Sequence, residues 1–292
     1  MIKGSIVALV TPFSEDGSVN YFKLGELIEW HISNKTDAIL ILGTTGESST
    51  MSHEEDEEVC RFTVNKVAGR VPVIAGSGSN STETMLNKSL QFERCGADAL
   101  LLISPYYNKA NDEGMYLHFK TVADAVNIPC ILYNVPGRTS CSIPVDVVRR
   151  LSEHKNIVGI KEASGNVGYA TKISKLINDD FVMYNGNDDI TLPMLSLGAV
   201  GVISVFANIC PRETHDMVMS FLNDRPQESL RIQQKYLDLI NALFVEVNPI
   251  PVKEALNMMG FEVGGYRLPL YKMSDEHRAF LREKMIEVGV IG

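Results

Sequence analysis

Packing alone does not explain why position 161 is a lysine. It ends the apolar run "IVGIK", residues 157–161, and a lysine is almost never fully buried without a partner. Desolvation favours the neutral amine, and a neutral amine attacks a ketone to form a Schiff base, an electron sink for carbon–carbon chemistry. The structural alternative is a lysine paired with a carboxylate at the strand end. Lys161 is therefore a candidate nucleophile, with the ion pair left open.

Tyr133 and Arg138 lie in "LYNVPGRT", residues 132–139. Tyr133 ends the apolar run before the one that ends in Lys161, so we expect its hydroxyl within reach of an imine on that lysine, where it would transfer protons. Arg138 follows Pro-Gly in a turn, where its guanidinium fork suits a carboxylate. The structural alternatives are that Tyr133 only packs at the rim of the fold and that Arg138 is an ordinary solvent-exposed arginine.

Two further loops carry candidate groups. "GTTGES", residues 43–48, offers backbone N–H groups and small hydroxyls as an anion nest, but it lacks the GxxxxGK[ST] spacing of a P-loop. An ordinary strand–helix turn explains the same residues. "SPYYNK", residues 104–109, holds Tyr106 and Tyr107, which suit a rim, a catalytic role or, as paired aromatics, an interface.

Each of these groups lies at the end of, or just after, one of eight apolar runs that are rich in β-branched residues. Continuous apolar runs suit parallel strands buried on both faces. Eight such units separated by helical patterns, over roughly 220 residues, favour a (β/α)8 TIM barrel. A doubly wound open sheet is the competitor, and no GxGxxG follows the first run. The predicted strands are 5–10, 38–42, 71–75, 99–103, 130–133, 157–161, 181–184 and 201–205.

Helical patterns alone fill the chain after residue 210, covering 212–222, 227–245, 251–259 and 274–288. We expect barrel helix eight to run into a C-terminal helical extension. The predicted division is a (β/α)8 catalytic domain over 1–224 and a helical domain over 225–292. Helix ends are marked where Ser52 and Glu55 have capping-box spacing and where Gly96 suits a C-terminal cap.

Active sites of such barrels lie at the C-terminal ends of the strands. The amine of Lys161, the phenol of Tyr133, the guanidinium of Arg138 and the nest at 43–48 would then share one end of the barrel. A substrate with a ketone and a carboxylate would engage all of them. That pattern points to a 2-oxo acid, of which pyruvate is the smallest.

The charge and composition limit the partners. A net charge of -9 without a basic stripe argues against nucleic acid and anionic membranes. The first residues lack the pattern of a signal peptide, and no apolar run approaches the length of a membrane span. The 5 scattered cysteines and 6 histidines show no CxxC, HxH or HExxH spacing. We expect a cytoplasmic protein with reduced thiols and no metal site.

Three motifs in order resemble one family. "GTTGE" (43–47), "YNVPGRT" (133–139) and "GIKEASG" (159–165), with "NPIPVK" (248–253), resemble the pyruvate-dependent class I aldolases of the dihydrodipicolinate synthase/N-acetylneuraminate lyase superfamily over essentially the whole chain. The arginine after Pro-Gly resembles the synthase branch. The resemblance implies condensation of pyruvate with L-aspartate-4-semialdehyde to 4-hydroxy-tetrahydrodipicolinate, in lysine (diaminopimelate) biosynthesis.

The resemblance also implies roles for single residues. Lys161 would form the imine with pyruvate, and Tyr133 would relay protons together with Thr44 and with Tyr107 of a neighbouring subunit. Thr45 and the backbone around Thr44 would hold the pyruvate carboxylate. No metal or organic cofactor would be needed, and a homotetramer built as a dimer of dimers is expected. The second substrate would meet Arg138, and the pocket would be lined by Gly186 and Ile203.

A regulatory site is implied less completely. Some relatives bind lysine at a dimer interface through residues at the positions of Ser48, Ser49, His53, Asn80 and Tyr106. That site also uses a carboxylate where this chain has Thr84, and often a histidine where it has Asp56. Thr84 cannot pair with the α-amine of lysine, and Glu83 beside it points about 100° away on a helix. We therefore expect weak or absent inhibition by lysine.

Two other functions stay open at this point. A sibling aldolase that acts on a sugar acid, similar to N-acetylneuraminate lyase, would share the lysine and the tyrosine without depending on Arg138. A barrel that has lost its chemistry would serve as a binding protein or scaffold, since fold does not fix function. The presence of every candidate catalytic side chain disfavours the scaffold.

Overall fold

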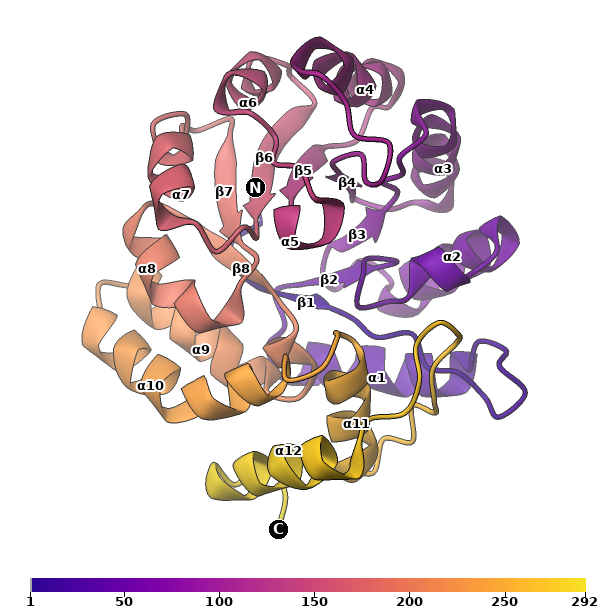
Figure 1. Cartoon of the computed structure of the whole chain (residues 1–292), viewed down its shortest axis with the longest axis vertical. Helices are drawn as coiled ribbons and strands as arrows, with labels where there is room; N and C mark the ends of the chain where they lie inside the picture. The colour runs from indigo at the N-terminus through magenta and orange to yellow at the C-terminus, as the bar shows by residue number, and fades with distance from the viewer. Residues whose placement is uncertain (1) are drawn as a thin grey trace.

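Eight short parallel strands close into a barrel in the computed structural model, which describes residues 2–292 (Figure 1). Each strand pairs with the next, and β1 closes the ring by pairing with β8. The predicted (β/α)8 barrel is confirmed. The strands are β1 Gly4–Ala8, β2 Ala38–Ile41, β3 Val73–Gly76, β4 Ala99–Ile103, β5 Cys130–Asn134, β6 Ile157–Glu162, β7 Val182–Asn185 and β8 Gly201–Ser204.

The strands are apolar on both faces because both faces are covered. Alternate residues such as Ile131, Tyr133 and Ile203 point into the barrel and form an inner cluster. Their neighbours, such as Leu132 and Val202, pack outward against the helices in a larger cluster. This division explains the continuous apolar runs in the sequence.

Helices surround the barrel and follow the strands in turn (Figure 1). Ser52 caps α2 as predicted, in a full capping box with Glu55. Gly96 ends α3 with a φ of 91°. The barrel helices are α1 Tyr21–Ser33, α2 His53–Val67, α3 Thr82–Cys95, α4 Asp112–Ala125, α5 Pro136–Thr139, α6 Val145–Ser152, α7 Val167–Ser174, α8 Thr191–Ser196 and α9 Pro211–Leu222, with short 3-10 turns η1 Ser48–Thr50, η2 Asp188–Ile190 and η3 Phe206–Asn208.

Three more helices complete the chain: α10 Pro226–Ala242, α11 Ile250–Met258 and α12 Asp275–Glu287. Helix α10 packs on α8 and α9, and α12 packs on α10 and α11. Figure 1 shows α11 and α12 at the lower edge of the molecule, with α12 outermost. The predicted boundary at 224/225 falls in the turn between α9 and α10; the division into two domains stays a prediction.

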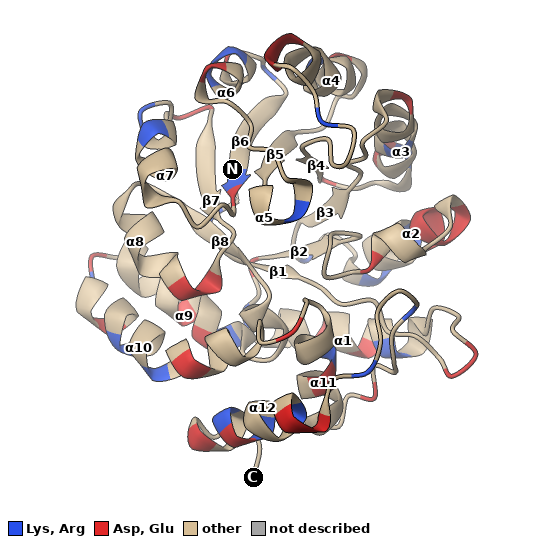
Figure 2. Cartoon of the chain, viewed as in Figure 1, with Lys and Arg blue, Asp and Glu red and all other residues tan. Residues whose placement is uncertain are grey.

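Charged residues lie mainly on the outer helices and the loops (Figure 2). Within the described chain, β6 is the only strand that carries Lys, Arg, Asp or Glu, and its two charged residues are Lys161 and Glu162. A further basic residue, Arg138, lies on α5 at the barrel mouth. Lys161 is therefore the only basic residue on the described strands, and it lies near the end of β6.

Candidate active site

Lys161 and Tyr133 are partners in the register of β6 and β5. The Lys161 side chain is buried, with 6% of the residue exposed. Its Nζ lies 4.5 Å from the centroid of the Tyr133 ring. The amine and the phenol are thus in contact at the C-terminal end of the barrel, where the sequence predicted them.

A cavity of about 520 Å³ opens at this end of the barrel. Its volume lies within the range of about 300–1,000 Å³ that is typical of ligand pockets, and both polar and apolar side chains line it. Most of the residues predicted to act at the site share its wall. These are Thr44, Thr45, Tyr133, Arg138, Lys161 and Gly186.

Gly186 makes room for the lysine. A Cβ at this position would lie 3.0 Å from Lys161 Cε and 2.5 Å from the Cβ of Ala163. Any larger residue would therefore displace either the lysine side chain or the loop that follows β6. The Gly186 amide also donates to the carbonyl of Glu162 at 2.7 Å, which fixes the end of β7 beside β6.

Asn248, which the sequence analysis did not single out, joins two predicted binding residues. Its amide nitrogen donates to Thr45 Oγ1 at 3.0 Å, and its main-chain carbonyl accepts from Arg138 Nη2 at 3.1 Å. Asn248 lines the same cavity and is buried. The only signal in the sequence is its place in "NPIPVK", a motif that by itself indicates no contact with the barrel.

Asp188 is a second residue that the sequence analysis missed. Its Oδ2 accepts hydrogen bonds from the amides of Val205 and Phe206, at 2.9 and 3.0 Å, and so ties the end of β7 to the end of β8. Burial raises the pKa of Asp188, and the nearby Lys161 ammonium acts in the opposite direction. No sign of this role is visible in the sequence, because Asp188 does not lie in or directly after an apolar run.

Two predicted residues do not line the cavity. Ile203 is buried in the inner barrel cluster, while Val205, two residues later, lines the cavity wall. Tyr107 is 93% exposed in the single chain and has a φ of 69°. Its predicted contribution to a neighbouring subunit's site stays a prediction.

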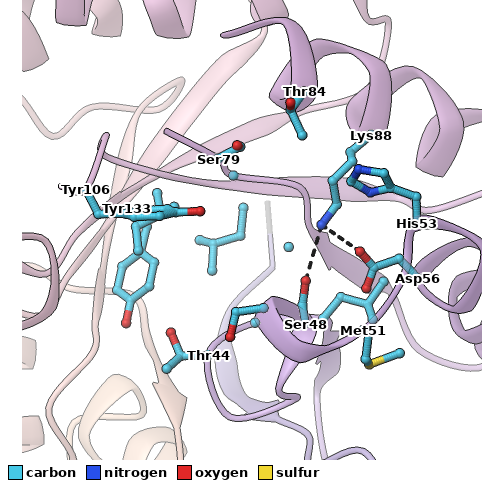
Figure 3. A pocket seen from close by; sticks show the side chains of 17 residues that line it. Thr44, Ser48, Met51, His53, Asp56, Ser79, Thr84, Lys88, Tyr106 and Tyr133 are labelled. Carbon is cyan, nitrogen blue, oxygen red and sulfur yellow. Dashed lines mark hydrogen bonds and ion pairs between the residues drawn. The ribbon is translucent and has the colours of Figure 1, made fainter. Parts of the chain in front are cut away.

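A second cavity, of about 300 Å³, lies between α2, α3 and the 43–50 loop. Figure 3 shows Thr44 and Tyr133 at one end of it and His53, Asp56 and Lys88 at the other. Of the residues proposed for an effector site, this cavity is lined by Ser48, Ser49, His53 and Tyr106, and Asn80 donates to the Tyr106 carbonyl at 3.2 Å. Lys88 had not been predicted here.

Neither a metal cluster nor a membrane span is found in the described part of the chain. No group of three or more His, Cys, Asp and Glu side chains among residues 2–292 is placed to hold a metal ion. No helix in that range is long and apolar enough to cross a bilayer.

Known proteins are similar to this chain in both sequence and structure. The sequence profile of the dihydrodipicolinate synthetase family matches residues 1–287. A 4-hydroxy-tetrahydrodipicolinate synthase of Clostridium perfringens (strain ATCC 13124) is 50% identical over 291 residues, which cover 100% of both chains. Dihydrodipicolinate synthase from Aquifex aeolicus has a TM-score of 0.96 at 46% identity, covering 99% of this chain and 98% of that one. The Acinetobacter baumannii enzyme complexed with pyruvate has a TM-score of 0.97 at 43% identity, covering 100% of both. The chain belongs to the dihydrodipicolinate synthetase family.

Proposed function

We propose that this protein is a 4-hydroxy-tetrahydrodipicolinate synthase, a lyase that condenses pyruvate with L-aspartate-4-semialdehyde through a Schiff base on Lys161. The observation that carries the proposal is the contact between Lys161 and Tyr133 in a cavity that also holds Thr45 and Arg138. The relatives named above bear the name of this enzyme, and none of them supports the sibling sugar-acid aldolase.

The reaction begins with the amine of Lys161. Its nitrogen adds to the C2 carbonyl of pyruvate, and water leaves to give an imine. Tyr133, with Thr44, carries the protons of these steps. Thr45 and the amides of its loop hold the pyruvate carboxylate. Loss of a proton from C3 converts the imine into an enamine, whose electrons come to rest on the lysine nitrogen.

The second substrate then enters at the mouth of the cavity. Arg138 binds the carboxylate of L-aspartate-4-semialdehyde, and the enamine carbon attacks its aldehyde, which takes up a proton to become a hydroxyl. The substrate amine attacks the imine carbon and displaces Lys161. This transimination closes the ring of 4-hydroxy-tetrahydrodipicolinate and restores the free lysine, in the first committed step of lysine (diaminopimelate) biosynthesis.

The proposal includes the setting of the enzyme. The lysine amine supplies the electron sink, so the reaction draws on no organic cofactor or metal. The protein acts in the cytoplasm as a homotetramer, a dimer of dimers in which Tyr107 of one subunit completes the proton relay of its partner.

Borohydride trapping tests this mechanism. Reduction in the presence of pyruvate should leave a stable adduct on Lys161, read by peptide mass spectrometry. Lys161→Ala should abolish the adduct, while Lys155→Ala, at an exposed lysine just before β6, should retain it. In a coupled assay with dihydrodipicolinate reductase, wild-type protein should consume reduced nicotinamide when given both substrates. An unmodified Lys161 in wild-type protein would refute the Schiff-base assignment.

A further inference from the structure

The second cavity has a buried ion pair in its wall (Figure 3). Lys88 Nζ on α3 lies 2.7 Å from Asp56 Oδ2 on α2, and it donates to Ser48 Oγ at 3.2 Å. The two charged side chains are 9% and 1% exposed. An ion pair this far from solvent must satisfy its charges internally, because burial removes the hydration of both.

The surroundings of the Lys88 nitrogen are those of a site for a primary ammonium ion. A carboxylate and a hydroxyl oxygen accept its hydrogen bonds, and the ring of Phe92 lies with its centroid 5.7 Å away. Asp56 Oδ1 has no hydrogen-bond partner among the described residues, so Lys88 is the partner on which this buried carboxylate depends. An unpaired carboxylate in the same place would be costly.

This cation site adjoins the catalytic cavity. Thr44 and Tyr133 line both cavities, and Ser48, which accepts from Lys88, lies in the same loop as Thr44. The Lys88 ammonium therefore braces α2, α3 and this loop at a point close to the predicted proton relay.

We propose that this cavity is a cation site whose resident ligand is the chain's own Lys88 side chain, and that removal of the Lys88 amine converts it into a site for a small free primary ammonium ion. The tether gives Lys88 a high effective concentration, so free ions do not displace it from the wild-type protein. The tethered amine also gives a structural reason, beyond Thr84, to expect weak inhibition by lysine.

The test uses Lys88→Ala and n-propylammonium, which carries the three carbons and the nitrogen that the substitution removes. The variant should unfold at a temperature roughly 10 °C lower than wild-type protein, because it leaves Asp56 buried and unpaired. n-Propylammonium chloride should raise that temperature saturably. Sodium chloride and tetramethylammonium chloride at equal ionic strength should not, and the wild-type midpoint should not respond to the amine.

Two control variants isolate the ion pair. Asp56→Asn with Lys88→Met removes both charges and keeps the side-chain volume, so its midpoint should lie closer to wild type and should not respond to the amine. Lys120→Ala removes a partly exposed surface lysine, paired with Asp124 at 2.6 Å, and should change little. A folded Lys88→Ala protein without an amine-specific rise overturns the proposal.

If Lys88→Ala does not fold in sodium chloride, refolding with n-propylammonium is the equivalent test. Recovery in that salt alone supports the proposal, and failure in every salt contradicts it. Because these measurements use thermal unfolding and no substrate, their outcome is independent of the proposed reaction.

Discussion

Lys161 and Glu162 are neighbours in the chain but face opposite sides of the barrel wall. Lys161 points inward to the cavity, whereas Glu162 points outward, where Asn134 donates to its Oε2 at 2.7 Å and the Ser164 amide donates to its Oε1 at 2.8 Å. Burial raises the pKa of Glu162, against the effect of these hydrogen bonds. Because Asn134 follows Tyr133, Glu162 clamps β5 to β6 at the position where the amine meets the phenol.

A variant of Arg138 distinguishes the two halves of the proposed reaction, imine formation with pyruvate and condensation with the semialdehyde. Arg138→Ala should lower kcat/KM for L-aspartate-4-semialdehyde about 100-fold or more, because it removes a charged hydrogen-bond donor to the substrate carboxylate. The proposed imine formation with pyruvate uses Lys161, Tyr133 and the loop around Thr45 but not Arg138, so borohydride trapping should remain nearly intact. Steady-state kinetics and trapping on the same preparation give both readouts.

Arg149 offers the matched control for this variant. It lies exposed on α6 and pairs with the surface carboxylates Asp146 and Glu153. Arg149→Ala should leave both readouts unchanged. Undiminished turnover of the semialdehyde by Arg138→Ala would show that another residue binds the carboxylate.

At the scale of the element, the C-terminal helices hold the loop that we propose binds pyruvate. Lys253 on α11 is fully buried, and its Nζ lies 2.8 Å from Glu47 Oε1 and 3.1 Å from the carbonyl of Thr11. Thr11 Oγ1 in turn donates to the carbonyl of Gly46 at 2.6 Å. Burial lowers the pKa of Lys253, and Glu47 opposes the shift. A helix far along the sequence thus fixes the loop that begins at β2.

Lys253→Met tests this anchor. It leaves the Glu47 carboxylate buried without its cation, and should lower the free energy of unfolding by about 3–5 kcal/mol. Displacement of the loop should also raise the KM for pyruvate. Urea unfolding and pyruvate kinetics measure the two effects.

The control for the anchor is an exposed ion pair. Lys66 lies 3.1 Å from Glu29 on the surface, and Lys66→Met should cost at most about 1 kcal/mol. Glu47→Gln combined with Lys253→Met should recover part of the lost stability. A Lys253→Met protein as stable as Lys66→Met would rule out a structural role for the pair.

The strands were predictable because each is a continuous apolar run, and the errors lie at their ends. Strands β5, β6 and β7 each run one residue further than expected, to Asn134, Glu162 and Asn185. A strand prediction based on apolar residues ends before these polar ones. In the fold their side chains form hydrogen bonds: Asn134 donates to Glu162, and Asn185 donates to Thr191. The third strand begins at Val73 and not at residue 71 as predicted, because Pro72 has no N–H to donate to a neighbouring strand.

The contacts that hold the site were not predictable in the same way. Lys161 and Tyr133 could be placed together because both lie next to the C-terminal ends of adjacent strands. Asn248 contacts Thr45 across 203 positions of sequence, and Lys253 contacts Glu47 across 206. No local pattern encodes such pairs, because they depend on where the C-terminal helices pack.

At the scale of the whole molecule, the single chain presents Tyr107 to solvent. The turn that carries it is held by the Asn108 amide, which donates to the Tyr106 carbonyl at 2.9 Å, and by the Asn108 side chain, which donates to the Asn80 carbonyl at 2.9 Å. A bulky residue with positive φ costs of order 1–3 kcal/mol, so this turn holds Tyr107 in a strained conformation. An exposed, held tyrosine suits a contact with a second copy of the chain.

Mixing inactive subunits tests whether Tyr107 acts across an interface. Tyr107→Phe removes the hydroxyl and should lower kcat about 100-fold, while Lys161→Ala should be inactive. In a hybrid dimer, the lysine of the Tyr107→Phe subunit would meet the intact Tyr107 of its partner. Random reassociation at equal amounts should then restore about a quarter of the wild-type sites, because half the dimers are hybrid and each holds one intact site.

The control pairs Lys161→Ala with Tyr133→Phe. Tyr133 and Lys161 belong to one cavity of one chain, so hybrids of these two variants contain no intact site and should stay inactive. Activity measured after co-refolding, with each variant refolded alone as reference, distinguishes the two arrangements. If the mixture of Tyr107→Phe and Lys161→Ala shows no more activity than the sum of its components, Tyr107 does not act across the interface. The proposed proton relay would then have to reach solvent within one subunit.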